Sequence, residues 1–502
     1  MSSRFLSFPI LKLPVFAFIV FAVAFGFAPA RASLDPARAD ASVWTYRDAH
    51  PQGSLPLIVQ SERATDPTAL VRAAGGTVRG ELGIIHAVAA DVPADRLGEL
   101  TLARGVSWVS LDGTVSATDN AFDYSKFPAS VYPQEIHADN AWSSGNSGQG
   151  IGVAVLDTGV YASKDFNSNG PNRLVSNVGK GGPNADGFGH GSHVAGLVGG
   201  NGANSDGKYV GVAPRANIVN VKVGDDQGFA TISDVINGLQ FVADNQAKYN
   251  IRVVNLSLRS DVAQSYTTDP LDAAVEFLTF RGILVVVAAG NLGSAADAVS
   301  YAPANDPFVL SVGAVDDIGT PDFKDDLLPS WSSRGQTQDG FAKPDVSVPG
   351  RHLISVLSPG SVLATAFPDN VVGKDYFQLS GTSMSAGVAS GAAALVIKAH
   401  TDWTPGQVKL ALMQTAASLP SNSSVKVALV DRTIALKSPP ADTALSIKPN
   451  YLLLTAAGVA DPQSVSWGSV SWGSISWGSI SWGSISWGSV SWGSVSWGNV
   501  KD

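Results

Sequence analysis

Leu379-Ser-Gly-Thr-Ser383-Met-Ser-Ala-Gly387 decides the fold of this chain, because it runs directly into the apolar stretch Val388-Ala-Ser-Gly-Ala-Ala-Ala-Leu-Val-Ile397. The pattern predicts a loop of small residues that leads into a buried helix. Ser383 falls near the junction, where the first backbone N–H groups of a helix have no partner inside the helix. Such an end stabilises negative charge, so a serine there can attack a carbonyl group and have the resulting oxyanion held by nearby N–H groups.

The same stretch also fits a simpler structure, a Ser/Thr-rich N-cap on a buried helix. It is not the G-x-S-x-G motif of an α/β-hydrolase, because Ser385 stands where the second glycine should be. Other parts of the chain are needed to decide whether Ser383 is a nucleophile or only part of a helix cap.

Length and composition set the limits. A chain of 502 residues suggests two to four units, and 45% apolar residues suffice for a large core. The net charge of -9, without a block of Lys or Arg, argues against nucleic acid as a partner. Because there is no cysteine, disulfides and thiol catalysis are both excluded.

Residues 1–32 have the pattern of a secretory signal peptide. Arg4 and Lys12 supply positive charge before an apolar run over 15–27, and Ala30-Arg31-Ala32 fits a cleavage site. An uncleaved membrane anchor is the alternative. No other segment is long and apolar enough to cross a membrane, so we expect a mature protein without a span, secreted to the medium, the periplasm or the cell surface.

The pattern that follows, residues 43–117, predicts a small α+β domain with a split βαβ plan like that of ferredoxin. Its expected strands and helices are strands at 56–59, 84–91 and 106–111, helices at 67–74 and 94–102, and a further strand at 76–79. Residues 116–121 are expected to be a linker.

Residues 118–437 predict an α/β domain in which a parallel sheet is sandwiched between helices in three layers, because near-continuous apolar runs alternate with helical patterns. The expected strands are 153–156, 218–223, 253–258, 283–288 and 309–314, and the expected helices are 232–243, 270–281 and 405–417.

The C-terminal part has two segments. Residues 438–462 contain Pro439, Pro440 and Pro449 and are expected to be a linker. Residues 463–500 repeat Ser-Trp-Gly-Ser-Val/Ile with a period of five. This β-prone, uncharged tail is a candidate for binding carbohydrate or a surface or for self-association, and a low-complexity tail without specific chemistry is the alternative.

A carboxylate is expected at the edge of the sheet. Gly150-Ile-Gly-Val-Ala-Val-Leu-Asp157-Thr-Gly159 is a buried strand that ends on Asp157, at the edge where ligand sites lie in such folds. An aspartic-protease motif is the alternative, but that mechanism needs two such carboxylates and no second Asp-Thr/Ser-Gly exists.

A general base is expected from Gly187-Phe-Gly-His190-Gly-Ser-His193-Val-Ala-Gly196, because imidazole titrates near neutral pH. A metal pair is conceivable for His190 and His193, but zincins space two His by four with a Glu between, and no Glu or Cys follows here. His193 is therefore expected to be structural.

An oxyanion donor is expected from Ile283-Leu-Val-Val-Val-Ala-Ala-Gly290-Asn291, since an Asn just past a buried strand can aim its amide at developing charge. An ordinary Gly-Asn turn is the alternative.

Together these stretches, in the order Asp, His, Asn, Ser, resemble the subtilisin-like serine proteases (subtilases, peptidase family S8) over about residues 125–437. The likeness extends through Gly211-Val-Ala-Pro214, Asn255-Leu-Ser-Leu258 and Pro344-Asp-Val-Ser-Val-Pro-Gly350. The resemblance implies that Ser383 is the nucleophile, His190 the general base and acid, and Asp157 the residue that orients His190. It further implies that Asn291 and the Ser383 N–H hold the oxyanion.

The resemblance also implies a substrate groove in which Gly224–Gly228 and Asn255–Arg259 pair with extended polypeptide, while Ala288–Gly290 and the region of Ser300 wall the pocket before the cut. The implied substrate-binding residues are Gly228, Ser257, Leu258, Arg259, Ala289, Gly290 and Ser300. Plain core strands are the alternative.

The chain departs from the family pattern at three places. Gly387 stands where Pro is usual, and Arg259 replaces a usual Gly beside the groove. Residues 201–207, where some relatives insert a calcium loop, hold one carboxylate, so we expect no cofactor and at most a weak calcium site.

The resulting hypothesis is an exported endopeptidase that acts on polypeptides and is made as a zymogen. Its N-terminal domain, resembling an inhibitor-I9-like propeptide, is expected to inhibit the enzyme until the chain cuts itself near Ser116–Asn120. The alternative is a silent scaffold whose Trp tail does the work.

Overall fold

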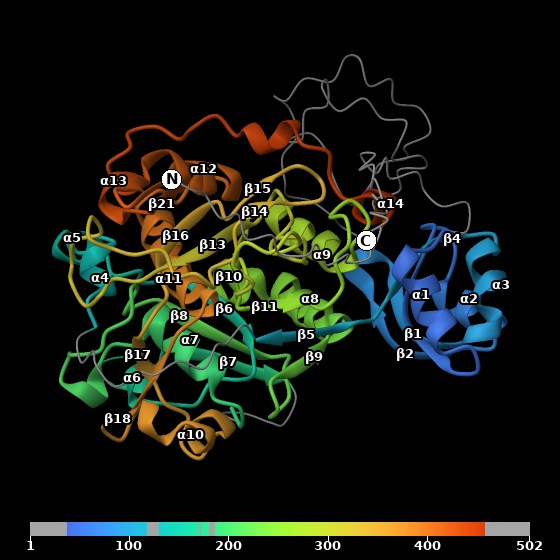
Figure 1. The fold of residues 1–502 in the computed structure, drawn as a ribbon, viewed down its shortest axis with the longest axis horizontal. Helices are drawn as coiled ribbons and strands as arrows, with labels where there is room; N and C mark the ends of the chain where they lie inside the picture. Colours follow the sequence, from blue (N-terminus) through green and yellow to red (C-terminus); the bar gives the residue numbers. More distant parts are fainter. Residues whose placement is uncertain (1–37, 118–129, 169, 171, 180–185, 457–502) are drawn as a thin grey trace, which may run out of the picture.

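A computed structural model describes residues 38–117, 130–168, 170, 172–179 and 186–456. The expected signal peptide (1–32), the repeats (463–500) and most of the expected cleavage segment lie outside these residues. The described chain forms a small N-terminal unit and a larger α/β unit that lie against each other (Figure 1).

The N-terminal unit is a four-stranded antiparallel sheet in the order β2-β3-β1-β4, with helices packed on one face. The strand expected at 76–79 is β2. Its elements are α1 (Ala41–Ala49), β1 (Ser54–Ser61), α2 (Pro67–Ala73), β2 (Thr77–Leu82), β3 (Ala87–Pro93), α3 (Leu97–Leu102) and β4 (Val106–Leu111).

Both faces of this small sheet are buried. Successive side chains along β1 alternate between the two faces and show what each face packs against. Leu57 and Val59 pack in the unit's own core with Val71 and Leu97. Ile58, which points the other way, belongs to a cluster shared with the larger unit. The sheet is therefore a layer between its own helices and the larger unit.

The larger unit is built on a nine-stranded sheet in the order β20-β21-β16-β13-β12-β10-β6-β8-β7, parallel except for the β20–β21 pair. This confirms the expected, largely parallel α/β architecture. The strands are β6 (Gly152–Asp157), β7 (Leu174–Gly179), β8 (Asn217–Lys222), β10 (Ile251–Leu256), β12 (Leu284–Ala288), β13 (Leu310–Val315), β16 (Val346–Pro349), β20 (Ala417–Leu419) and β21 (Asn422–Val427).

Helices cover both faces of this sheet, because its strands are apolar on both sides. On β6, Val153 and Val155 pack in one cluster and Ala154 and Leu156 in the other. The first face carries α7 (His190–Gly199), α11 (Thr382–Ala399) and α12 (Pro405–Thr415), and the second carries α8 (Ile232–Tyr249) and α9 (Pro270–Phe280).

Smaller elements complete the unit. These are α4 (Tyr132–Glu135), α5 (Ala138–Ser143), α6 (Lys164–Asn167), α10 (Val362–Ala366), α13 (Val430–Ile434), β17 (Leu353–Val356), β18 (Val371–Val372) and β19 (Tyr376–Leu379). Within the described part of the chain, α11 is the one helix long and apolar enough to cross a membrane, and 89% of it lies buried inside the protein as a core helix.

The structure corrects several boundaries. The run 253–258 splits into β10 and a separate strand β11 (Leu258–Ser260), because the chain leaves the large sheet after Leu256. Ser116 and Ala117, expected in a linker, belong to strand β5 (Thr114–Ala117). Residues 224–228 do not form a strand, and the strand at this edge is β9 (Phe229–Thr231).

The segment 438–462 is more ordered than its prolines suggested. Up to Ala456 it contains a 3-10 turn, η5 (Thr443–Ser446), and a helix, α14 (Tyr451–Ala456). Three consecutive leucines, Leu452, Leu453 and Leu454, are each at most 4% exposed. Burial of these leucines stabilises the position of the helix. The prediction of a linker considered only the prolines and did not weigh this apolar run.

Candidate active site

Asp157 and His190 meet at the carboxyl edge of the large sheet. Asp157 is the last residue of β6, and His190 is the first residue of α7. The His190 Nδ1–H donates to Asp157 Oδ1 over 2.7 Å, and the side chains are 0% and 3% exposed. This pairing leaves the far ring nitrogen, Nε2, as the one that can handle a proton.

The N-terminus of α7 is fixed by Asp186, a residue that sequence reasoning did not single out. Its buried carboxylate accepts the N–H groups of Gly189 and Ser192, both over 2.8 Å, and the hydroxyls of Ser192 and Thr158. A carboxylate just before a helix satisfies the unpaired N–H groups there and favours the helix dipole. Burial raises the pKa of Asp186, and these donors oppose that effect. The signal in the sequence was an Asp placed just ahead of a predicted helix start.

Ser383 is the second residue of α11 and is hydrogen-bonded to Ser257, which directly follows β10. Its Oγ donates to the Ser257 carbonyl over 3.2 Å, while the Ser257 hydroxyl donates to the Ser383 carbonyl over 2.9 Å. Ser383 is fully buried. The reciprocal pair fixes the position of the serine relative to the strand.

Glycines on α11 bring α7 and α11 into close parallel contact. A Cβ placed on Gly387 would lie 3.2 Å from the Val194 carbonyl oxygen, and one on Gly391 would lie 3.0 Å from that of Val198. The contact advances by four residues in both helices. Moving four residues toward the N-terminus from the first contact gives Ser383 on one helix and His190 on the other, so the two lie at the same end of adjacent helices.

Asn291, just past β12, is oriented by Thr382. Its Oδ1 accepts the backbone N–H and the hydroxyl of Thr382, each over 3.0 Å, and Thr382 Oγ1 in turn accepts the Gly290 N–H over 3.0 Å. Since Oδ1 faces Thr382, the amide nitrogen is the end of the Asn291 side chain that lies farther from Thr382. Thr382 was not among the predicted site residues, although its place directly before Ser383 was a visible signal.

His193 is structural, as the sequence suggested. Its Nε2–H is shared between the carbonyls of Leu353 and Phe377, over 3.1 and 3.0 Å. Complete burial lowers the pKa of His193 to about 3, so the ring is neutral. Among the described residues, no group of three or more His, Asp or Glu is arranged to hold a metal ion.

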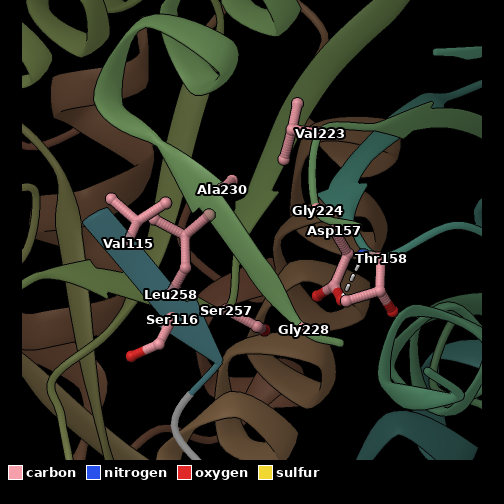
Figure 2. A pocket seen from close by; sticks show the side chains of 10 residues that line it. All are labelled: Val115, Ser116, Asp157, Thr158, Val223, Gly224, Gly228, Ala230, Ser257 and Leu258. Atoms are coloured by element: carbon pink, nitrogen blue, oxygen red, sulfur yellow. Dashed lines mark hydrogen bonds between the residues drawn. The ribbon is translucent and has the colours of Figure 1, made fainter. Parts of the chain in front are cut away.

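A pocket adjoins Asp157 and runs along the predicted groove. Figure 2 shows Asp157 and Thr158 on one side of it and Val115 and Leu258 on the other. The pocket is lined by Val115, Ser116, Asp157, Thr158, Val223, Gly224, Gly228, Ala230, Ser257 and Leu258. Three predicted substrate-binding residues, Gly228, Ser257 and Leu258, are thus brought together with Asp157.

The other predicted groove residues are placed differently. Gly290 joins the site through its bond to Thr382, and Ala289 is tied to Val312 in the sheet by its N–H. Ser300 is buried, its carbonyl accepts from Gln338, and it does not line this pocket. Arg259 lies on β11 with its guanidinium 4.7 Å from the centre of the Tyr301 ring.

Strand β5 of the chain itself lies along the predicted groove. It lies between β11 and β9 and is antiparallel to both, with Ala117 opposite Leu258 and Ser116 opposite Arg259 and Phe229. A segment bound in this way uses backbone hydrogen bonds as an added strand. The N-terminal unit therefore reaches into the site through its own last strand (Figure 1).

Fold and site together define a class: an α/β protein with a serine, a histidine and an aspartate gathered at the carboxyl edge of a parallel sheet, as in serine peptidases. Comparison with known families is more specific. Residues 148–443 match the model of the subtilase family, Peptidase S8, and the chain belongs to that family.

Known proteins agree with this assignment. The chain is similar to serine protease AprX of Bacillus subtilis, 39% identical over 54% of this chain and 63% of AprX, so it spans less than two thirds of that relative. It is 33% identical to subtilisin Savinase of Lederbergia lenta over 60% of this chain and 96% of that protein. The fold resembles that of fervidolysin from Fervidobacterium pennivorans, described as a keratinolytic enzyme related to subtilisin, with a TM-score of 0.60 and 22% identity over 76% of this chain and 61% of that one.

Proposed function

We propose that the protein is a serine endopeptidase that hydrolyses peptide bonds through Asp157, His190 and Ser383. Ser383 Oγ attacks the carbonyl carbon, His190 accepts its proton and later delivers it to the leaving amine, and Asp157 orients His190 and stabilises its charged form. The observation that carries this proposal is the His190–Asp157 hydrogen bond of 2.7 Å at the end of a helix whose parallel neighbour carries Ser383.

Asn291 is the oxyanion donor in this proposal, together with the N–H of Ser383. The two hydrogen bonds that Thr382 donates to Asn291 Oδ1 support the assignment, because they fix the oxygen end of the amide and leave the nitrogen end as the donor in this proposal. A donor that is fixed before the reaction needs no reorganisation when charge develops.

The N-terminal unit acts in this proposal as an inhibitory propeptide. Two observations support it: β5 fills the strand position of a substrate, and His190 and Ser383 are both 0% exposed in this form of the chain. Ser383 lies beside Ser257, so the residue opposite Ser257 would present its carbonyl to the nucleophile. Because Ala117 is opposite Leu258, extending the register by one residue predicts cleavage of the Thr118–Asp119 bond.

The sequence pattern of residues 1–32 supports export in this proposal, and the product is expected in the medium, the periplasm or at the cell surface. No cofactor is needed for the proposed reaction, and polypeptides are the substrates. The Trp repeats remain a candidate for binding a surface.

Two experiments test the function. A fluorophosphonate labels only an activated serine, so the matured protein should react and a Ser383→Ala chain should not. An unlabelled wild-type protein would favour the alternative of a silent scaffold. The Ser383→Ala precursor, purified alone, should also stay uncut, whereas wild type should yield a new N-terminus at Asp119; trimming of the Ser383→Ala chain at that bond would refute self-processing.

A further inference from the structure

Helix α14 lies where the N-terminal unit meets α9 of the larger unit, although in the sequence it follows all other elements of the larger unit (Figure 1). The carbonyl oxygen of Leu452 accepts a hydrogen bond from Gln60 Nε2 over 2.7 Å, between residues 392 positions apart. The helix therefore contacts both units at once.

On one side α14 is anchored to the larger unit through Asn450, which is fully buried. The Asn450 N–H donates to Glu276 Oε2 over 2.8 Å, and its side-chain amide donates to the carbonyls of Tyr266 and Asp269. The next residue donates its N–H to the Thr267 carbonyl over 2.7 Å. These bonds do not involve the N-terminal unit, so departure of that unit removes none of their donors or acceptors.

On its other side α14 faces the N-terminal unit. Leu452 and Leu453 belong to the same buried apolar cluster as Ile84, Ile85 and Trp108. Apolar area that two bodies bury together stabilises their association.

Gln60 adds a polar contact to this surface. It is 1% exposed on β1, and its Nε2 donates to the carbonyls of Ile85, over 2.6 Å, and Leu452. A buried amide needs its partners, and α14 supplies one of the two acceptors.

We infer that α14 is part of the surface that holds the N-terminal unit, and that it slows release of this unit after the chain has been cut. The inference rests on the proposed role of the N-terminal unit as a propeptide. The segment before the Trp repeats thus sets how long the enzyme remains inhibited.

The test compares two truncated precursors: one that ends at Pro449 and lacks α14, and a matched control that ends at Ala456 and lacks only the residues after α14. Each is purified as the self-cut complex and diluted into a chromogenic peptide substrate, and the lag before full activity reports release. We expect the chain ending at Pro449 to activate at least about tenfold faster, since it no longer buries the leucines. The control should show the same lag as full-length protein. The two truncated chains and the full-length protein should all reach the same final kcat/KM.

If truncation at Pro449 impairs folding, Leu453→Ala in the chain ending at Ala456 tests the same surface, because it keeps the Asn450 anchor and removes only apolar contact. It should shorten the lag, and an unchanged lag would overturn the inference. A second variant tests the polar contact. Gln60→Met, in the departing unit and remote from the reacting groups, should shorten the lag in the chain ending at Ala456 and have a smaller effect in the chain ending at Pro449, because the lost bond to Leu452 is absent there already. Equal lags in the two truncated chains, or an equal effect of Gln60→Met in both, overturn the inference. If full-length protein never cuts itself, the zymogen proposal fails first, and the role of α14 fails with it.

Discussion

Thr382→Val is the substitution that most directly tests how the site is organised. Thr382 is fully buried and contacts Asn291 twice, through its N–H and through its hydroxyl. Valine keeps the shape and the backbone bond but removes the hydroxyl, so Asn291 loses one of its two restraints and the Gly290 N–H loses its acceptor.

The size of the effect can be bounded. Complete loss of an oxyanion donor costs about 3–4 kcal/mol in transition-state stabilisation, a magnitude measured on an oxyanion-hole Asn of subtilisin, and the proposed role of Asn291 makes this the upper limit here. A single neutral hydrogen bond contributes about 1 kcal/mol. Since the N–H bond remains, we expect Thr382→Val to lower kcat by roughly fivefold and leave KM nearly unchanged.

The assay is the kinetics of peptide hydrolysis by matured enzyme, with active sites counted by fluorophosphonate. Thr382→Ser is the matched control and should retain most activity, because it keeps the hydroxyl. In the Asn291→Ala background the valine should cost almost nothing more, since Thr382 acts through Asn291. Fully additive losses, or a rise in KM without a fall in kcat, would refute the reasoning.

Three other predictions concern the surroundings of the site. Asp186→Asn should lower kcat/KM by about tenfold and move the acidic limb of the pH–rate profile to lower pH, because it removes acceptors at the start of α7 and a negative charge near His190; an unchanged profile would contradict this. Gly191→Ala should cut kcat by about a hundredfold or more without preventing folding, as checked by circular dichroism, because its Cβ would lie 2.2 Å from the Gly159 carbonyl oxygen and must move His190 away from Asp157. Asp317→Asn should stabilise a Ser383→Ala chain by up to about 4 kcal/mol at pH 8 and hardly at all at pH 4, as measured by urea unfolding, because burial raises the pKa of Asp317 to about 7. An acid whose pKa is raised in the folded state lowers the free energy of unfolding as the pH rises from its unfolded pKa, about 4, to its folded pKa, about 7. Above pH 7 this loss is complete and grows no further. Equal effects of Asp317→Asn at pH 4 and pH 8 would therefore contradict the prediction.

Much of the fold could be predicted because its signals are local. Apolar runs without alternation mark β6, β10, β12 and β13 as strands buried on both faces, and the glycine-flanked motifs around Asp157, His190, Asn291 and Ser383 mark where strands end and helices begin. Errors concern short segments whose structure depends on partners. Residues 229–231 are a strand because β5 lies beside them, and Ser116 and Ala117 are ordered for the same reason.

By itself the sequence determined the parallel α/β architecture and the family, and it indicated the groups to which the proposed chemistry is assigned, since backbone preference, burial pattern and side-chain type are properties of short stretches. Only the tertiary structure decided which buried polar groups support them. Thr382 and Asp186 act through hydrogen bonds to Asn291 and to the start of α7, and α14 contacts a strand nearly four hundred residues away. Such contacts depend on the packing of whole layers, and no local pattern along the chain encodes a distance between segments that far apart.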